Sequence, residues 1–196
     1  MLNSTLAEVV VREVAVSERA AARDLLVSAF ERMPFARWAF PDDAAGRQAA
    51  HARLFDHTFA QGGAVVEGAY DTVSSTLLAV AVWFPPGCLM TEEEELPGSS
   101  VPRPEAAALF AAVEAATPPR STHHYLAFLG SAQRGGGGGS ALLRHRLGCF
   151  DGEPFCLWTG DEANLGFYAR FGFEVQRRLD FPGASAWWLT RPAAGA

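Results

Sequence analysis

The stretch QRGGGGGSALLRH, residues 133–145, decides the fold of this chain, and its five consecutive glycines can be interpreted in three ways. A flexible linker is one, but the run joins an apolar, strand-like segment directly to a segment with leucines at helical spacing. A nucleotide-binding turn is another, yet no P-loop lysine follows the glycines, and a dinucleotide-binding turn would follow an early strand. The third is a strand, a glycine loop and a helix N-terminus, whose bare amides can bind a phosphate chain. The position of the run, well past the middle of the chain, favours the third interpretation.

Composition limits the class of protein. A chain of 196 residues with 49% hydrophobic and 19% charged residues is typical of one globular domain. The net charge of −6 argues against nucleic acid as the main partner and fits a cationic small molecule better. The three cysteines have no metal-ligand spacing, so we expect free thiols and no metal site. No segment has the pattern of a signal peptide or of a membrane span, which indicates a cytoplasmic protein.

Hydrophobic periodicity predicts alternating strands and helices in a single α/β domain, residues 1–196. The expected strands cover residues 9–16, 64–70, 77–84, 123–130, 154–160, 174–181 and 185–191. The expected helices cover residues 22–33, 46–61, 104–113, 143–150 and 164–172. An aromatic loop, PFARWAF, is expected at 34–40, and an acidic loop follows residue 90.

Two motifs resemble those of the GNAT superfamily of N-acetyltransferases. Arg134 and the glycines before SALL resemble its [QR]-x-x-G-x-[GA] loop, and NLGFYARFGF, residues 164–173, resembles its N-x-x-[FA]-Y-x-[RK]-x-GF segment. The layout outside the motifs resembles that of puromycin N-acetyltransferases and their actinobacterial relatives. The resemblance implies a GNAT fold, α/β (α+β), with a mixed, mostly antiparallel sheet of about six or seven strands flanked by about four or five helices. It also implies acetyl-CoA (coenzyme A) as the cofactor.

The same resemblance assigns roles to individual residues. It implies that a backbone amide at Phe128 or Leu129 would hold the thioester oxygen of the cofactor. The residues that would hold its pyrophosphate are Arg134, Gly135, Gly136, Gly137, Gly138, Gly139 and Ser140. Asn164 would bind the pantetheine arm, cap the following helix, or do both. Tyr168 would be the general acid that protonates the departing thiolate. Gly137 and Gly139 fill the motif's glycine positions. The other three glycines stand at variable positions and are expected to make the loop loose, mobile without cofactor and ordered with it.

The general base is open to several assignments. His123 and His124 begin the strand that leads to the glycines, and a histidine, which titrates near about pH 6.5, suits accepting a proton from an ammonium. Because neighbouring strand residues face opposite sides, at most one of the two faces the site. The resemblance favours His123, and an ordinary strand-end histidine is the alternative. Glu67 and Glu162 are further candidates.

The acceptor is expected between the early helices and the later strands. Aromatic side chains that could contact it there are Phe35, Trp38, Trp83 and Trp158. Many relatives carry a glutamate where Trp158 stands, and the loop before the glycines is shorter here, so a different substrate is indicated. The acidic residues Glu92–Glu95 could attract an amine.

The predicted activity is acetylation of a primary amine on an antibiotic-like or aminonucleoside-like small molecule, by direct transfer in a ternary complex. Acetylation of a protein N-terminus or lysine is one alternative. A CoA-binding module without catalysis is the other. The predicted assembly is a monomer or a homodimer.

Overall fold

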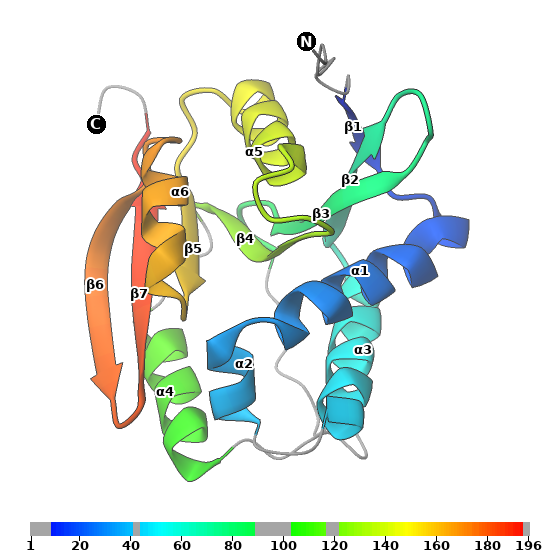
Figure 1. Cartoon of the computed structure of the whole chain (residues 1–196). Helices are drawn as coiled ribbons and strands as arrows, with labels where there is room; N and C mark the ends of the chain where they lie inside the picture. The colour runs from blue at the N-terminus through cyan, green and yellow to red at the C-terminus, as the bar shows by residue number, and fades with distance from the viewer. Residues whose placement is uncertain (1–8, 41–43, 89–102, 117–121, 194–196) are drawn as a thin grey trace, which may run out of the picture.

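The computed structural model describes residues 9–40, 44–88, 103–116 and 122–193. These residues form a seven-stranded sheet in the order β1-β2-β3-β4-β5-β7-β6 (Figure 1). The strands are β1 (Val9–Glu13), β2 (Val65–Asp71), β3 (Leu77–Phe84), β4 (His124–Ser131), β5 (Phe155–Thr159), β6 (Glu174–Phe181) and β7 (Ala184–Arg191). Only β4 and β5 pair in parallel, so the prediction of a mixed, mostly antiparallel sheet is confirmed.

Six α-helices accompany the sheet in the described part of the chain, where about four or five were predicted. They are α1 (Arg19–Glu31), α2 (Pro34–Ala39), α3 (Ala44–Ala60), α4 (Pro104–Ala115), α5 (Gly138–Cys149) and α6 (Leu165–Ala169). The additional helix is α2, which replaces the predicted aromatic loop. Its first residue is Pro34, whose fixed φ suits a first helical turn, and Met33 before it is extended. The acidic residues Glu92–Glu95 lie outside the described residues.

The central strands of the sheet are buried on both faces, because each face has its own hydrophobic cluster. Helices α1, α3 and α4 cover one face, where Leu26, Phe55 and Trp188 are almost fully buried. The indole Nε1 of Trp188 donates a hydrogen bond to the carbonyl oxygen of Val113 in α4 at 2.9 Å. Helices α5 and α6 cover the other face, with Leu143 among its fully buried residues. Among the described residues, no helix combines the length and the apolar character needed to cross a bilayer.

Candidate functional site

The strands β4 and β5 separate part of the way along the sheet, and the candidate site lies where they separate. The two strands pair in parallel only as far as Leu126. Directly after that residue β4 has a bulge at Ala127 in its pairing with β3, and a bulge bends a strand. Beyond the bulge, β4 has no strand partner on the side of β5. Backbone amides near Phe128 and Leu129 are therefore not all committed to the sheet, as a backbone donor for a thioester oxygen requires.

The glycine run turns the chain from β4 into α5. Gly135 and Gly137 have φ angles of 80° and 85°, in the left-handed region that favours glycine. Gly137 is the N-cap residue of α5, and no side chain caps the helix. The first amides of α5 are thus free to bind an anion, which the helix dipole favours. A cavity of about 350 Å³ lies in front of them, and Arg134 and Arg170 contribute to its wall.

The glycines differ in what they do, and two of the three at variable motif positions, Gly135 and Gly138, have structural roles of their own. Gly138 is buried, and a Cβ atom there would lie 2.9 Å from Ala79 Cβ and 3.2 Å from Leu78 Cβ of β3. Glycine at this position therefore lets α5 approach the sheet closely. Gly135 is needed for its positive φ. A Cβ at Gly139 would have no neighbour closer than 3.7 Å, so core packing does not require glycine there. The missing side chain at Gly139 instead leaves space in the cavity.

Arg134 links the glycine loop to the start of α6. Its guanidinium donates to Asn164 Oδ1 at 2.7 Å and to Asp161 Oδ2 at 3.3 Å, and Asn164 Nδ2 donates to Thr159 Oγ1 at 3.3 Å. Asn164 makes no side-chain cap bond to α6, so the prediction that it caps this helix is wrong. Asp161 caps the short 3-10 turn before it by accepting from the Ala163 amide. The Arg134 side chain is 74% exposed, so its guanidinium can also reach an anion in the cavity.

Tyr168 lies on α6, where its ring packs against Phe167 and Phe173. Burial raises the pKa of the Tyr168 hydroxyl well above its usual value of about 10. The hydroxyl makes no hydrogen bond to any residue in the described parts of the chain. It therefore keeps its proton at neutral pH and is free to donate it.

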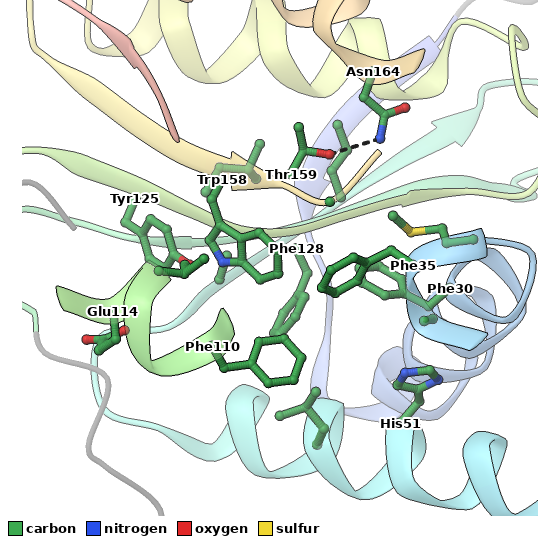
Figure 2. Close-up of a pocket in the computed structure, with 18 of the residues that line it drawn as sticks. Phe30, Phe35, His51, Phe110, Glu114, Tyr125, Phe128, Trp158, Thr159 and Asn164 are labelled. Atoms are coloured by element: carbon green, nitrogen blue, oxygen red, sulfur yellow. Dashed lines mark hydrogen bonds between the residues drawn. The ribbon is translucent and has the colours of Figure 1, made fainter. Parts of the chain in front are cut away.

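A second cavity, of about 360 Å³, is also lined by Tyr168 and has aromatic rings in its wall (Figure 2). Its rings include Phe30, Phe35, Phe110, Phe128 and Trp158. Leu129, Asn164 and Tyr168 line both cavities. A molecule in the aromatic cavity and one in front of the glycine loop would therefore meet at these three residues.

Two of the four predicted acceptor contacts line the aromatic cavity. Phe35 and Trp158 do so, with ring centroids 5.6 Å apart in an edge-to-face contact. The prediction for Trp83 is wrong, because its fully buried ring lies in the cluster on the other face of the sheet, against Phe155. The prediction for Trp38 is also wrong, because its indole packs against the turn between β6 and β7. A Cβ at Gly183 in that turn would lie 2.6 Å from Trp38 Nε1.

None of the predicted general bases lines the aromatic cavity. His123 hydrogen-bonds to Thr122 Oγ1 at 2.9 Å and precedes β4, about 20 Å along the strand from Leu129 at about 3.3 Å per residue. Glu67 is buried in an ion pair with Arg146, 3.3 Å away. Glu162 is exposed in the 3-10 turn.

The neighbouring histidine, His124, faces the second cluster. Its Nε2 atom lies 2.6 Å from Glu153 Oε2, and its ring stacks on Phe155. His124 therefore belongs to the structural core, and neither histidine lines the cavity.

Sequence reasoning missed four polar side chains of the cavity wall, which are His51, Glu114, Tyr125 and Thr159. His51 shares one face of α3 with Leu54, Phe55 and Thr58, at the i, i+3, i+4, i+7 spacing of a buried helical stripe. A histidine within such a stripe is a signal that could have been read from the sequence. In the described ranges, no group of three His, Cys, Asp or Glu side chains is placed to hold a metal ion.

Comparison with solved structures identifies the fold. A crystal structure of a "histone acetyltransferase HPA2 and related acetyltransferase" from Corynebacterium glutamicum matches with a TM-score of 0.69 and 21% identity, over 96% of this chain and 98% of that one. The C-terminal condensation domain of Ebony, in complex with beta-alanyl-dopamine, matches with a TM-score of 0.66 and 10% identity, over 94% and 98%. A GNAT family acetyltransferase from Brucella melitensis, in complex with acetyl-CoA, matches with a TM-score of 0.53 and 17% identity, over 97% and 90%. No model of a known protein family matches the chain, and no curated protein matches it. The chain has the GNAT fold.

Proposed function

We propose that this protein is an acetyl-CoA-dependent N-acetyltransferase that acts on a primary amine of a small molecule by direct transfer in a ternary complex. The observation that carries the proposal is the meeting of two cavities at Tyr168, one in front of an uncapped helix N-terminus and one walled by aromatic rings. Structures with this fold include one in complex with acetyl-CoA and one in complex with coenzyme A.

The first cavity fits a cofactor that carries a pyrophosphate. The Cβ positions of Gly135 and Gly137 have no neighbour within 4 Å, so the backbone borders open space that side chains would fill. The amides at the start of α5 would donate to phosphate oxygens, and Arg134 would add a charge-assisted contact. Asn164, fixed by Arg134 on one side and Thr159 on the other, would orient the arm that leads to the junction.

The residues at the junction supply what an acyl transfer requires. When bound, acetyl-CoA supplies a thioester, whose carbonyl carbon forms a bond to the amine nitrogen as its bond to sulfur breaks. A free amide of β4 near Phe128 or Leu129 donates to the carbonyl oxygen and stabilises the charge that develops there. The Tyr168 hydroxyl gives its proton to the departing sulfur, and the proton that the nitrogen loses restores the hydroxyl through solvent.

The second cavity favours a small, largely apolar acceptor over a protein side chain. A volume of about 360 Å³ with mostly apolar walls that include several aromatic rings is typical of small-molecule sites. The carboxylate of Glu114 borders this cavity and would attract a cationic amine. The narrower class, an antibiotic-like or aminonucleoside-like amine, is supported by the sequence resemblance alone.

The test follows release of free thiol from acetyl-CoA with a panel of amines. Tyr168→Phe should lower kcat by about 10²–10⁴-fold, the usual contribution of a general acid, while the affinity for coenzyme A stays the same. Tyr70→Phe is the matched control, since it removes the hydroxyl of a tyrosine in β2 that lines neither cavity. Coenzyme A binding without turnover of any amine would favour the non-catalytic module. Full activity in Tyr168→Phe would refute the role of the tyrosine.

A further inference from the structure

The aromatic cavity contains a buried histidine that has no hydrogen-bond partner among the described residues. His51 is 4% exposed and lines the cavity from α3. Its Nδ1 atom is buried with no partner, and no hydrogen bond joins its other ring nitrogen to any of the described residues. A buried polar group without a partner costs roughly 1–3 kcal/mol, so such a group in a cavity wall marks a place where a ligand atom belongs.

The ring of His51 is held rigidly in place. It stacks on Phe55 at 6.0 Å between ring centroids, and the rings of Phe30 and Phe40 meet it edge to face at 6.0 and 5.8 Å. A ring fixed on three sides cannot turn to find a partner elsewhere. Because Nδ1 is fully enclosed, Nε2 is the ring nitrogen that can meet a molecule in the cavity.

Folding favours the neutral form of His51. Burial lowers its pKa, the nearby cation of Arg47 lowers it further, and the carboxylate of Glu31 opposes both effects. Arg47 and Glu31 are paired with each other at 2.6 Å. A neutral imidazole offers one donor and one acceptor, which suits a hydroxyl group, because a hydroxyl can both donate and accept.

The position of His51 separates it from the reacting atoms. Figure 2 shows Asn164, which lines both cavities, on one side of the aromatic rings and His51 on the other. An amine that reacts at the junction of the cavities would therefore have its far end near His51. The rings of Phe35, Phe128 and Trp158 between the two would contact a flat apolar body through their faces and edges.

We infer, on the basis of the proposed function, that His51 determines specificity by binding a hydroxyl group at the far end of an aromatic acceptor amine. The acceptor class is a primary amine joined by a short apolar chain to a ring that carries a hydroxyl. His51 is a recognition residue in this account, and it takes no proton from the amine.

The experiment compares matched pairs of amines that differ by one para-hydroxyl group. The pairs are hydroxybenzylamine with benzylamine, tyramine with phenethylamine, and 3-(4-hydroxyphenyl)propylamine with its deoxy form. The three pairs differ in the length of the chain between the amine and the ring, so that one of them matches the length of the cavity. For that pair the hydroxyl should raise both kcat/KM and the calorimetric affinity of the CoA-saturated protein by roughly 10–100-fold. His51→Phe should abolish this preference, and His51→Gln, which keeps a donor and an acceptor, should retain part of it.

Phe110→Leu is the matched control, because it trims a ring of the same cavity wall that packs against Phe35 and Trp158, and it removes no polar atom. It should lower kcat/KM for both members of a pair and leave their ratio unchanged. Thermal melts of each variant verify that it is folded.

Three results would overturn the inference. The first is turnover without any preference for a hydroxyl, and the second is a hydroxyl preference that survives in His51→Phe. The third is an equal loss of kcat for both amines in His51→Phe together with a shifted pH profile, which would show that His51 is a proton acceptor. A hydroxyl preference in binding without turnover of any amine would support the role of His51 and refute the proposed function. Neither binding nor turnover of any pair would refute the acceptor class.

Discussion

Replacing Gly138 by alanine should destabilise the protein by a predictable amount. The new methyl group would lie 2.9 Å from Ala79 Cβ and 3.2 Å from Leu78 Cβ, atoms that β3 holds in place. The start of α5 would therefore have to move away from the sheet. Overpacking of this kind costs about 1–3 kcal/mol, and the better helix propensity of alanine recovers up to about 1 kcal/mol. We expect the free energy of unfolding to fall by about 1–2 kcal/mol and Tm by roughly 2–8 °C.

Two other glycines of α5 are matched controls. Gly148 has open space around its Cβ position, so Gly148→Ala should raise the free energy of unfolding by about 0.5–1 kcal/mol. Gly139→Ala meets nothing closer than 3.7 Å and should stay stable, but its methyl group would enter the cavity and weaken coenzyme A binding about tenfold or more. Urea unfolding and calorimetric titration of all three variants measure both effects. If Gly138→Ala is as stable as Gly148→Ala, the close approach of α5 to β3 is not what requires glycine there.

Three further predictions concern charged and titratable groups. Arg134→Gln should leave Tm unchanged, because the side chain is exposed, and should weaken coenzyme A binding about tenfold with a smaller salt dependence in calorimetry. Arg146→Ala leaves Glu67 buried without its partner and should cost about 3–5 kcal/mol in urea unfolding, a cost that Glu67→Gln partly relieves. Since the pKa of His51 is lowered on folding, the unfolded chain binds a proton that the folded chain refuses. The free energy of unfolding should therefore fall as the pH drops below about 6.5, and less so in His51→Phe.

The strand pattern of this chain predicts where strands lie better than which face each residue takes. β3, with the sequence LLAVAVWF, is apolar throughout because helices cover both faces of the sheet. No polar alternation distinguishes the two faces, so Trp83 could not be assigned to one from the sequence. The register settles it, because the bulge at Ala127 sets which residues of β3 and β4 share a face.

The cavity in front of the glycine loop was predictable from the sequence, and the aromatic cavity largely was not. The glycines and Tyr168 belong to two short contiguous motifs, so the local sequence is enough to identify them. The aromatic cavity is assembled from α1, α2, α3, α4, β4, β5 and α6, most of which are far apart in the sequence. His51 belongs to a buried helical stripe, and only the tertiary structure shows that the stripe ends at a cavity.

A crystal structure of the protein with coenzyme A tests the central claim most directly. We expect the pyrophosphate on the amides at the start of α5, the pantetheine arm beside Asn164, and the sulfur within hydrogen-bonding reach of the Tyr168 hydroxyl at the junction of the two cavities. A coenzyme bound elsewhere, or with its sulfur directed away from Tyr168, would contradict it.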